Sequence, residues 1–124
     1  MTGDEIGKLL GLMALADNRK PPEDDEGRRV MIEFWLRMVG DLTYADASEA
    51  VLAHYRESRE WVMPSDIRER VKAVRAERLD QTPPPPPPPE LLDDPDAYRQ
   101  YLRESTKRIA DGKPELRMIG GTSS

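Results

Sequence analysis

The sequence contains no cysteine and a single histidine, and only 6% of its residues are aromatic. Without cysteine the chain can form neither a disulfide framework nor a thiolate metal site, which fits a reducing compartment. An excess of positive charge is also missing, because 19 Lys and Arg residues stand against 24 Asp and Glu residues. Duplex-binding domains usually carry a positive field, so we expect no strong binding to duplex DNA.

Long apolar runs are absent too. No stretch approaches the roughly 18 consecutive apolar residues of a transmembrane helix, and we expect no membrane association. Near the N-terminus, Asp4 and Glu5 occupy positions where a signal peptide carries basic residues. The sequence therefore predicts a cytoplasmic protein.

Residues that carry catalysis in other proteins are scarce. There is no G-x-x-x-x-G-K-[ST] phosphate-binding loop. The acidic run over residues 23–26 lacks the alternating ligands and central glycine of an EF-hand loop, and is more typical of a solvated helix start. His54 lies on the apolar stripe of an expected helix, where a packed histidine is a commoner role than a catalytic base. We therefore expect that the protein is not an enzyme and that it binds neither a metal nor a cofactor.

Large apolar side chains are concentrated in the first two thirds of the chain. Residues 2–82 contain 26 of them and residues 83–124 only 9. The first part can enclose a small core, whereas the second is too polar to fold alone. This division predicts a head domain over residues 1–80, a proline-rich linker over 81–94, an amphipathic helix over 95–112 and a disordered tail over 113–124.

The first two helices of the head follow from capping and periodicity. Thr2 and Glu5 form a capping-box pattern that opens a helix over residues 3–16, with Leu15 at the edge of its apolar stripe. A second helix over residues 24–39 contains the only Phe and one of the two Trp residues. We expect this second helix to be the centre of the core.

Two further helices complete the head. Thr43 is a suitable N-cap for the third, and Pro64 is suited to the first turn of the fourth. No segment alternates with period two, so no sheet is expected beyond a short extended piece near residues 61–63. The fold class is therefore all-α, with a compact four-helix N-terminal domain.

Seven consecutive prolines occupy residues 83–89. Each proline fixes φ and removes a backbone donor, so the run can neither continue a helix nor join a sheet. Polyproline II rises about 3.1 Å per residue, which makes the run a stiff spacer of roughly 20 Å. We expect it to keep the following helix away from the head. The alternative is a ligand for an aromatic-lined groove.

After the prolines, Asp94 and Pro95 form a helix-start signature. The helix that follows has too little apolar surface to be stable alone, and we expect it to be largely disordered when free. Its apolar face and the arginines beside it are the candidate partner-binding residues: Tyr98, Arg99, Tyr101, Leu102, Arg103 and Ile109.

The fourth helix carries a local excess of basic residues. Candidates for nucleic-acid or partner contact are Arg68, Lys72, Arg75 and Arg78. The alternative is a solvated face with ion pairs three and four residues apart inside the helix, which the mixture of charges favours.

The order of these signals is informative. A Trp-bearing helix is followed by the step GDLTYADASEAV into an Ala-rich helix, and MPSDI then opens another helix. This order resembles the phage replicative-helicase loader/inhibitor family, small all-α proteins without an ATPase motif. The resemblance covers about residues 4–78. It rests on Trp35, Leu42, Tyr44, Ala47, Ala50, Tyr55, Pro64, Asp66 and Ile67.

The resemblance implies a phage DNA-replication adaptor in the cytoplasm of a bacterial host. Such a protein binds and loads a hexameric replicative helicase, holds it inactive in solution and meets an origin-bound initiator protein. We expect a monomer when free, and the two-part architecture places the helicase contact on the C-terminal helix. Two alternatives stay open: a small DNA-binding or regulatory adaptor that uses the basic fourth helix, and a phage factor that binds another host protein.

Overall fold

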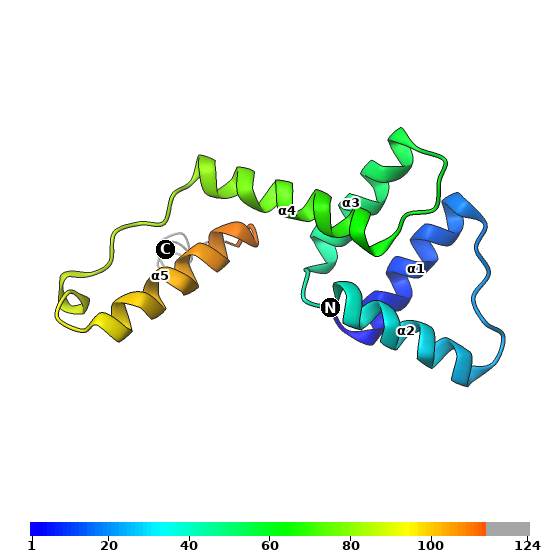
Figure 1. Ribbon diagram of the computed structural model, residues 1–124, viewed down its shortest axis with the longest axis horizontal. Coiled ribbons are helices and arrows are strands. Elements are labelled where there is room, and N and C mark those ends of the chain that lie inside the picture. Colours follow the sequence, from blue (N-terminus) through cyan, green and yellow to red (C-terminus); the bar gives the residue numbers. More distant parts are fainter. Residues whose placement is uncertain (114–124) are drawn as a thin grey trace, which may run out of the picture. The chain divides into compact units, whose positions relative to one another are not determined.

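A computed structural model describes residues 1–113, and within them the expected all-α fold is confirmed, without any strand (Figure 1). The tail expected over residues 113–124 lies, except for Lys113, outside the described residues. The elements in chain order are α1 (Gly3–Asp17), α2 (Asp25–Val39), α3 (Tyr44–Glu57), α4 (Pro64–Gln81), the short 3-10 helix η1 (Pro89–Leu91) and α5 (Pro95–Ala110).

The helix starts are those that the capping residues predict. At α1, the Thr2 hydroxyl accepts from the backbone N–H of Glu5, and the Glu5 carboxylate accepts in return from the backbone N–H of Thr2 at 2.9 Å. Thr43 and Asp94 cap α3 and α5 through their side-chain oxygens. Pro64 is the first residue of α4, where its missing N–H has no helical partner to lose.

The chain divides into two compact units, the first from Met1 to Val71 and the second from Lys72 onward. In the first unit α1 packs against both α2 and α3. Its side chains Ile6, Leu9 and Met13 are completely buried. The centre of this core is therefore α1.

The expectation that the second helix would be the centre of the core is wrong. Trp35 and Val39 of α2 are buried, but Phe34 is 51% exposed. Helix α2 has apolar residues on two sides, and only one side can face α1. Leu15 is also outside the core, with 85% of its surface exposed.

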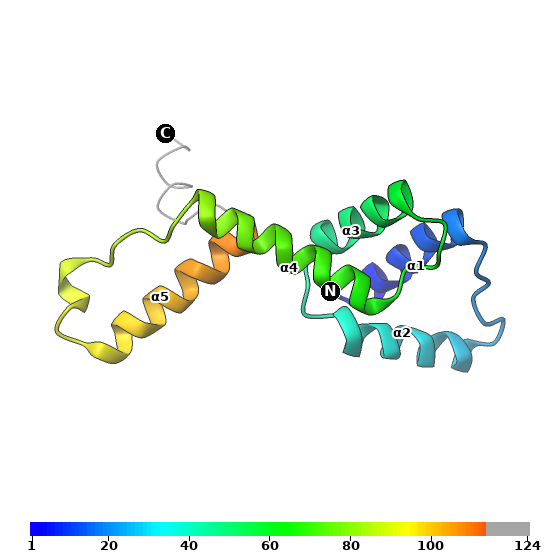
Figure 2. The same ribbon diagram turned by 45° about the horizontal axis from the view of Figure 1, so that its top comes forward.

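In the second unit, α5 runs back so that its C-terminal end lies beside α4 (Figures 1 and 2). Arg75 of α4 forms an ion pair with Asp111, and Arg78 Nη1 donates to the Ala110 carbonyl oxygen at 2.8 Å. Gly112 ends the helix with a left-handed φ of 75°. We expected the proline run to keep this helix away from the head over residues 1–80, but α5 contacts Arg75 and Arg78 at the end of that range because the chain turns back after the run.

Candidate protein-binding site

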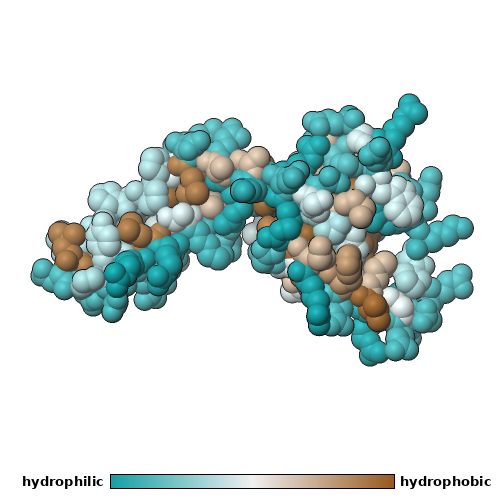
Figure 3. Space-filling view, in the orientation of Figure 1, coloured by the Kyte–Doolittle hydropathy of each residue, from teal (hydrophilic) through white to brown (hydrophobic). Residues whose placement is uncertain are grey.

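Helix α2 presents an apolar stripe to solvent. Val30, Phe34 and Met38 are 60%, 51% and 40% exposed. Residues four apart lie on the same side of a helix, so these three form one continuous strip. Figure 3 shows apolar surface over α2 between charged side chains. Large apolar side chains gathered in this way are typical of surfaces that bind other proteins.

Two further large side chains are exposed in the connection between α3 and α4. Trp61 is 54% exposed and Met63 is 57% exposed, while Val62 between them is buried. The guanidinium of Arg19 lies 4.9 Å from the centre of the Trp61 ring and 6.0 Å from that of Trp35. Cation–π contacts at these distances hold the indole of Trp61 in place at the surface.

Arg19 is itself fixed by a buried carboxylate. The side chain of Asp17 is 0% exposed, and both of its oxygens accept from Arg19 Nε at 2.9 Å. The Tyr55 hydroxyl donates to Asp17 and accepts from the backbone N–H of Val62 at 3.0 Å. This Asp17 cluster joins the end of α1, helix α3 and the segment before α4.

The electrostatics of the cluster favour the ionised carboxylate. Burial by itself raises the pKa of Asp17, but the hydrogen bonds from Arg19 and Tyr55 outweigh burial and the pKa is lowered below its ordinary value. Burial also raises the pKa of the Tyr55 hydroxyl, and its hydrogen bond to Asp17 raises it further. The proton therefore stays on Tyr55 and the charge on Asp17, so the cluster is a structural support.

The candidate partner-binding residues of α5 differ in exposure. Arg99 and Arg103 are exposed, and Tyr98, Tyr101 and Leu102 are half-buried. The Tyr101 hydroxyl donates to the carbonyl oxygen of Pro86 at 3.4 Å, which connects α5 to the proline run. Ile109 is only 8% exposed. In this structure a partner would reach the first two turns of α5 but not Ile109.

The basic residues of α4 are mostly engaged by other elements. Arg68 forms a bidentate pair with Asp41 at 2.7 and 3.0 Å, which lowers the pKa of that carboxyl. Arg70 pairs with Glu57 at 2.8 Å. Arg75 and Arg78 hold the end of α5, whereas Lys72 is exposed.

The alternative interpretation of α4 expected ion pairs between residues of the same helix, but three of its arginines pair with residues outside it. The pairs of Arg68, Arg70 and Arg75 all join α4 to residues outside it. At the end of α5, the Asp111 carboxylate accepts from both Arg75 and Lys107. Burial raises the pKa of Asp111, but these two cations outweigh it and the net shift is downward.

The remaining sequence candidates for chemistry have structural roles. His54 is 7% exposed and its Nε2 lies 2.7 Å from the carbonyl oxygen of Glu60. Asp24 caps α2 within the exposed acidic run. Among residues 1–113, no three His, Cys, Asp or Glu side chains lie close enough to hold a metal ion. In the same residues no helix has the length and apolar character needed to cross a membrane.

Sequence reasoning missed the Asp17 cluster and the exposure of the α2 stripe. Asp17 and Tyr55 are 38 residues apart in the chain, and no local pattern connects them. The existence of two apolar sides on α2 could have been found, because Val30, Phe34 and Met38 are offset from Trp35 and Val39 around the helix, but the sequence does not say which side is exposed.

Comparisons with known proteins give no relative for this chain. No protein-family model matches it, and no significant match is found among curated proteins or among solved structures.

Proposed function

We propose that this protein is a phage DNA-replication adaptor that binds a hexameric replicative helicase and loads it. The observation that carries a protein-binding function is the exposed stripe of Val30, Phe34 and Met38. A folded unit with this much uncovered apolar surface gains free energy when a partner covers it. The helicase as the partner is supported by the resemblance of the head sequence to the loader/inhibitor family.

The order of helices supports the same proposal. A Trp-bearing helix ends at Val39, the next begins at Tyr44, and a further helix opens at Pro64. These helix boundaries lie within the stretch, about residues 4–78, over which the sequence resembles the loader/inhibitor family. The proposal includes an origin-bound initiator protein as a second partner, a monomeric state when free, and the cytoplasm of a bacterial host as the location.

The proposal divides the work between the two units. The first unit binds one partner through its exposed apolar surface. In the second unit Tyr98, Tyr101 and Leu102, flanked by Arg99 and Arg103, bind the helicase. Tyrosine and arginine are the residue types that most often dominate protein interfaces.

Affinity capture from phage-infected cells, with the captured proteins identified by mass spectrometry, tests this assignment. We expect the native chain to recover the helicase and the double variant Tyr101→Ala with Leu102→Ala to lose it. A matched control is Gln100→Ala with Glu104→Ala, because these exposed residues of α5 bond to each other. Unchanged recovery of the helicase by the Tyr101 and Leu102 variant would contradict the role of α5.

A nucleic-acid adaptor is the second candidate, and the exposed Lys72 beside Arg68 on α4 is the observation in its favour. Against it, Arg68 is already paired with Asp41, and Arg75 with Asp111. Gel shifts at several salt concentrations separate the two functions, because phosphate binding must weaken steeply as salt is added. A third candidate, a phage factor that binds another host protein, would recover that protein in the capture experiment.

A further inference from the structure

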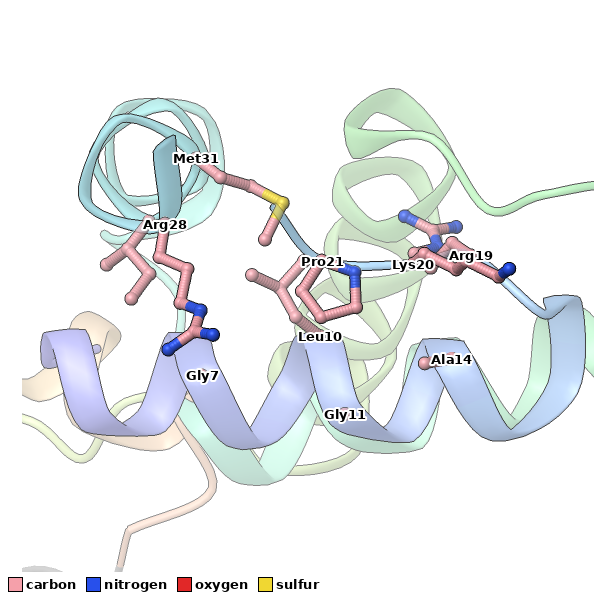
Figure 4. Close-up of a pocket in the computed structure, with 10 residues that line it drawn as sticks. Gly7, Leu10, Gly11, Ala14, Arg19, Lys20, Pro21, Arg28 and Met31 are labelled. Atoms are coloured by element: carbon pink, nitrogen blue, oxygen red, sulfur yellow. The ribbon is translucent and has the colours of Figure 1, made fainter. Parts of the chain in front are cut away.

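A pocket lies between α1 and α2 in the first unit, with a volume of about 290 Å³. Figure 4 shows α1 along the bottom of the pocket and α2 end-on at the upper left, and the segment that joins the two helices also lines the pocket. Met31 points from α2 into the space above Leu10, and Arg28 extends toward α1 beside Gly7. The lining residues are Gly7, Leu10, Gly11, Ala14, Arg19, Lys20, Pro21, Arg28, Met31 and Ile32.

The glycines at the bottom of the pocket have no role in the packing of the described residues. A Cβ atom added at Gly7 or Gly11 would meet nothing within 4 Å. Neither residue has a positive φ, so the backbone does not require glycine there. Glycine is nevertheless among the least favourable residues inside a helix. Because they have no side chain, the two glycines leave the pocket open and expose the backbone of α1.

The charged residues that line the pocket are all basic. Three basic residues and no acidic residue line it, although residues 1–71 contain 10 Lys and Arg against 15 Asp and Glu. Arg28 is held in position by the carbonyl oxygens of Pro22 and Glu23, at 2.9 and 3.0 Å. Arg19 is already paired with the buried carboxylate of Asp17, and Arg28 lies 3.8 Å from the fully exposed Asp25. A ligand carboxylate would therefore meet Lys20 and Arg28 rather than Arg19. An apolar space with a fixed basic rim is complementary to an apolar group that carries a carboxylate.

We propose that this pocket binds the leucine-like side chains of an acidic amphipathic helix from a partner protein. Gly7 and Gly11 are one turn apart, so the bare strip runs along α1 and lets a second helix approach closely. The pocket has room for one or two large apolar side chains, and Lys20 and Arg28 lie where acidic residues beside them would reach. The inference rests on the proposed function in one respect, since a partner protein supplies the helix.

Binding is tested on the full chain with a short helical peptide that has leucines on one face and glutamates on the other. The control peptide has lysine in place of each glutamate, and octanoate serves as a free aliphatic carboxylate. Affinity is measured by calorimetry, and the amide signals of Gly7 and Gly11 are followed by NMR. We expect the glutamate peptide to shift these signals and to bind at least about tenfold more tightly than the lysine peptide.

A pair of variants locates the binding. Gly11→Leu fills the pocket, whereas Ala16→Leu adds the same side chain at an exposed position of α1 outside the pocket lining. We expect Gly11→Leu to weaken the glutamate peptide about tenfold or more and Ala16→Leu to leave it unchanged. Thermal melting of both variants establishes that they are folded.

Equal binding of the glutamate peptide to the native chain and to Gly11→Leu would overturn the proposal, and so would equal binding of the two peptides. Binding of octanoate without binding of the glutamate peptide would replace the partner helix by a small amphiphile. The two proposals can fail separately. If the native chain recovers no helicase but still binds the glutamate peptide, the proposed function is overturned and the assignment of this pocket is not.

Discussion

At the scale of single residues, the Asp17 carboxylate stands out because no part of its side chain reaches solvent. A buried charge is tolerated only while its partners remain, and here Arg19 and Tyr55 supply them. The cluster also controls the position of Trp61, since Arg19 lies against that ring.

Asp17→Ala should destabilise the first unit by about 3 kcal/mol, because it leaves Arg19 partly buried without its counter-charge. Asp25→Ala is the matched control: that side chain is fully exposed, and its loss should change stability by less than about 0.5 kcal/mol. Urea denaturation of both variants measures the difference. Equal midpoints for the two variants would contradict the structural role of the cluster.

The stability of the protein should fall in acid. The folded state lowers the pKa of Asp17, so its contribution is complete above the unfolded pKa of about 3.9 and is lost as pH falls through the lower folded value. Asp41 and Asp111 have lowered pKa values as well and add to the same trend. Unfolding free energy measured between pH 7 and pH 2 should therefore decrease below about pH 4.

The variant Asp17→Asn isolates the contribution of one carboxylate to this trend. It has no ionisable group at this position, so its stability should decrease less steeply with acid than that of the native chain. Parallel curves for the two proteins would show that Asp17 does not contribute.

At the scale of the elements, α2 has two apolar sides with different roles. Trp35 is 7% exposed and packs in the core, whereas its neighbour Phe34 is 51% exposed. The two rings touch edge to face with their centres 6.1 Å apart. Adjacent residues of the same helix therefore provide a direct comparison between a core side chain and a surface one.

Trp35→Ala should cost about 3 to 5 kcal/mol of unfolding free energy, the range for a large buried aromatic side chain. Phe34→Ala should cost less than about 1 kcal/mol, because half of that side chain is already in water. Chemical denaturation followed by circular dichroism measures both. A larger loss for Phe34→Ala would mean that the stripe is covered in solution.

The positions of the helices could be predicted from the sequence, because caps and periodicity are local signals. Thr2, Thr43 and Asp94 each begin the helix that their side chains favour. Which apolar side is covered could not be predicted in the same way, since it depends on the neighbours that the chain brings together. For that reason the sequence places Leu15 at the edge of an apolar stripe and Phe34 on the helix expected at the centre of the core, and both are exposed.

The residues of the candidate sites also differ in whether the sequence alone could reveal them. The half-buried Tyr101 and Leu102 of α5 could be found from spacing alone. The pairs Arg75–Asp111 and Asp17–Tyr55 could not, because their members are 36 and 38 residues apart and meet only in the folded chain. The spacing of Gly7 and Gly11 inside a helical pattern was the one local signal of the pocket.

At the scale of the whole molecule, the two units differ in how they are stabilised. The first has a cluster of buried apolar side chains from all four of its helices, α1, α2, α3 and α4. In the described part of the second, residues 72–113, polar contacts hold the end of α5, and the buried apolar residues are Ile109 and Ala110. The proline run contributes by limiting the conformations of the chain between α4 and α5.

Replacement of the seven prolines at 83–89 by alternating Gly and Ser should speed hydrogen exchange in α5. A flexible connection has more conformations to lose when α5 returns to α4. Exchange in α1 should stay unchanged, and the control Pro21→Ala with Pro22→Ala should leave α5 unchanged. Mass spectrometry of proteolytic fragments measures hydrogen exchange in each helix separately. Equal acceleration in α1 and α5 would show that the two units open together.

Both tryptophans, Trp35 and Trp61, belong to the first unit and lie within 6.0 Å of the same guanidinium. Indole emission is therefore an optical reporter of that unit alone, and it is silent on α5. A melting curve recorded by fluorescence and one recorded by far-ultraviolet dichroism monitor different parts of this chain, so a gap between their midpoints would give the separate stability of the second unit without any label.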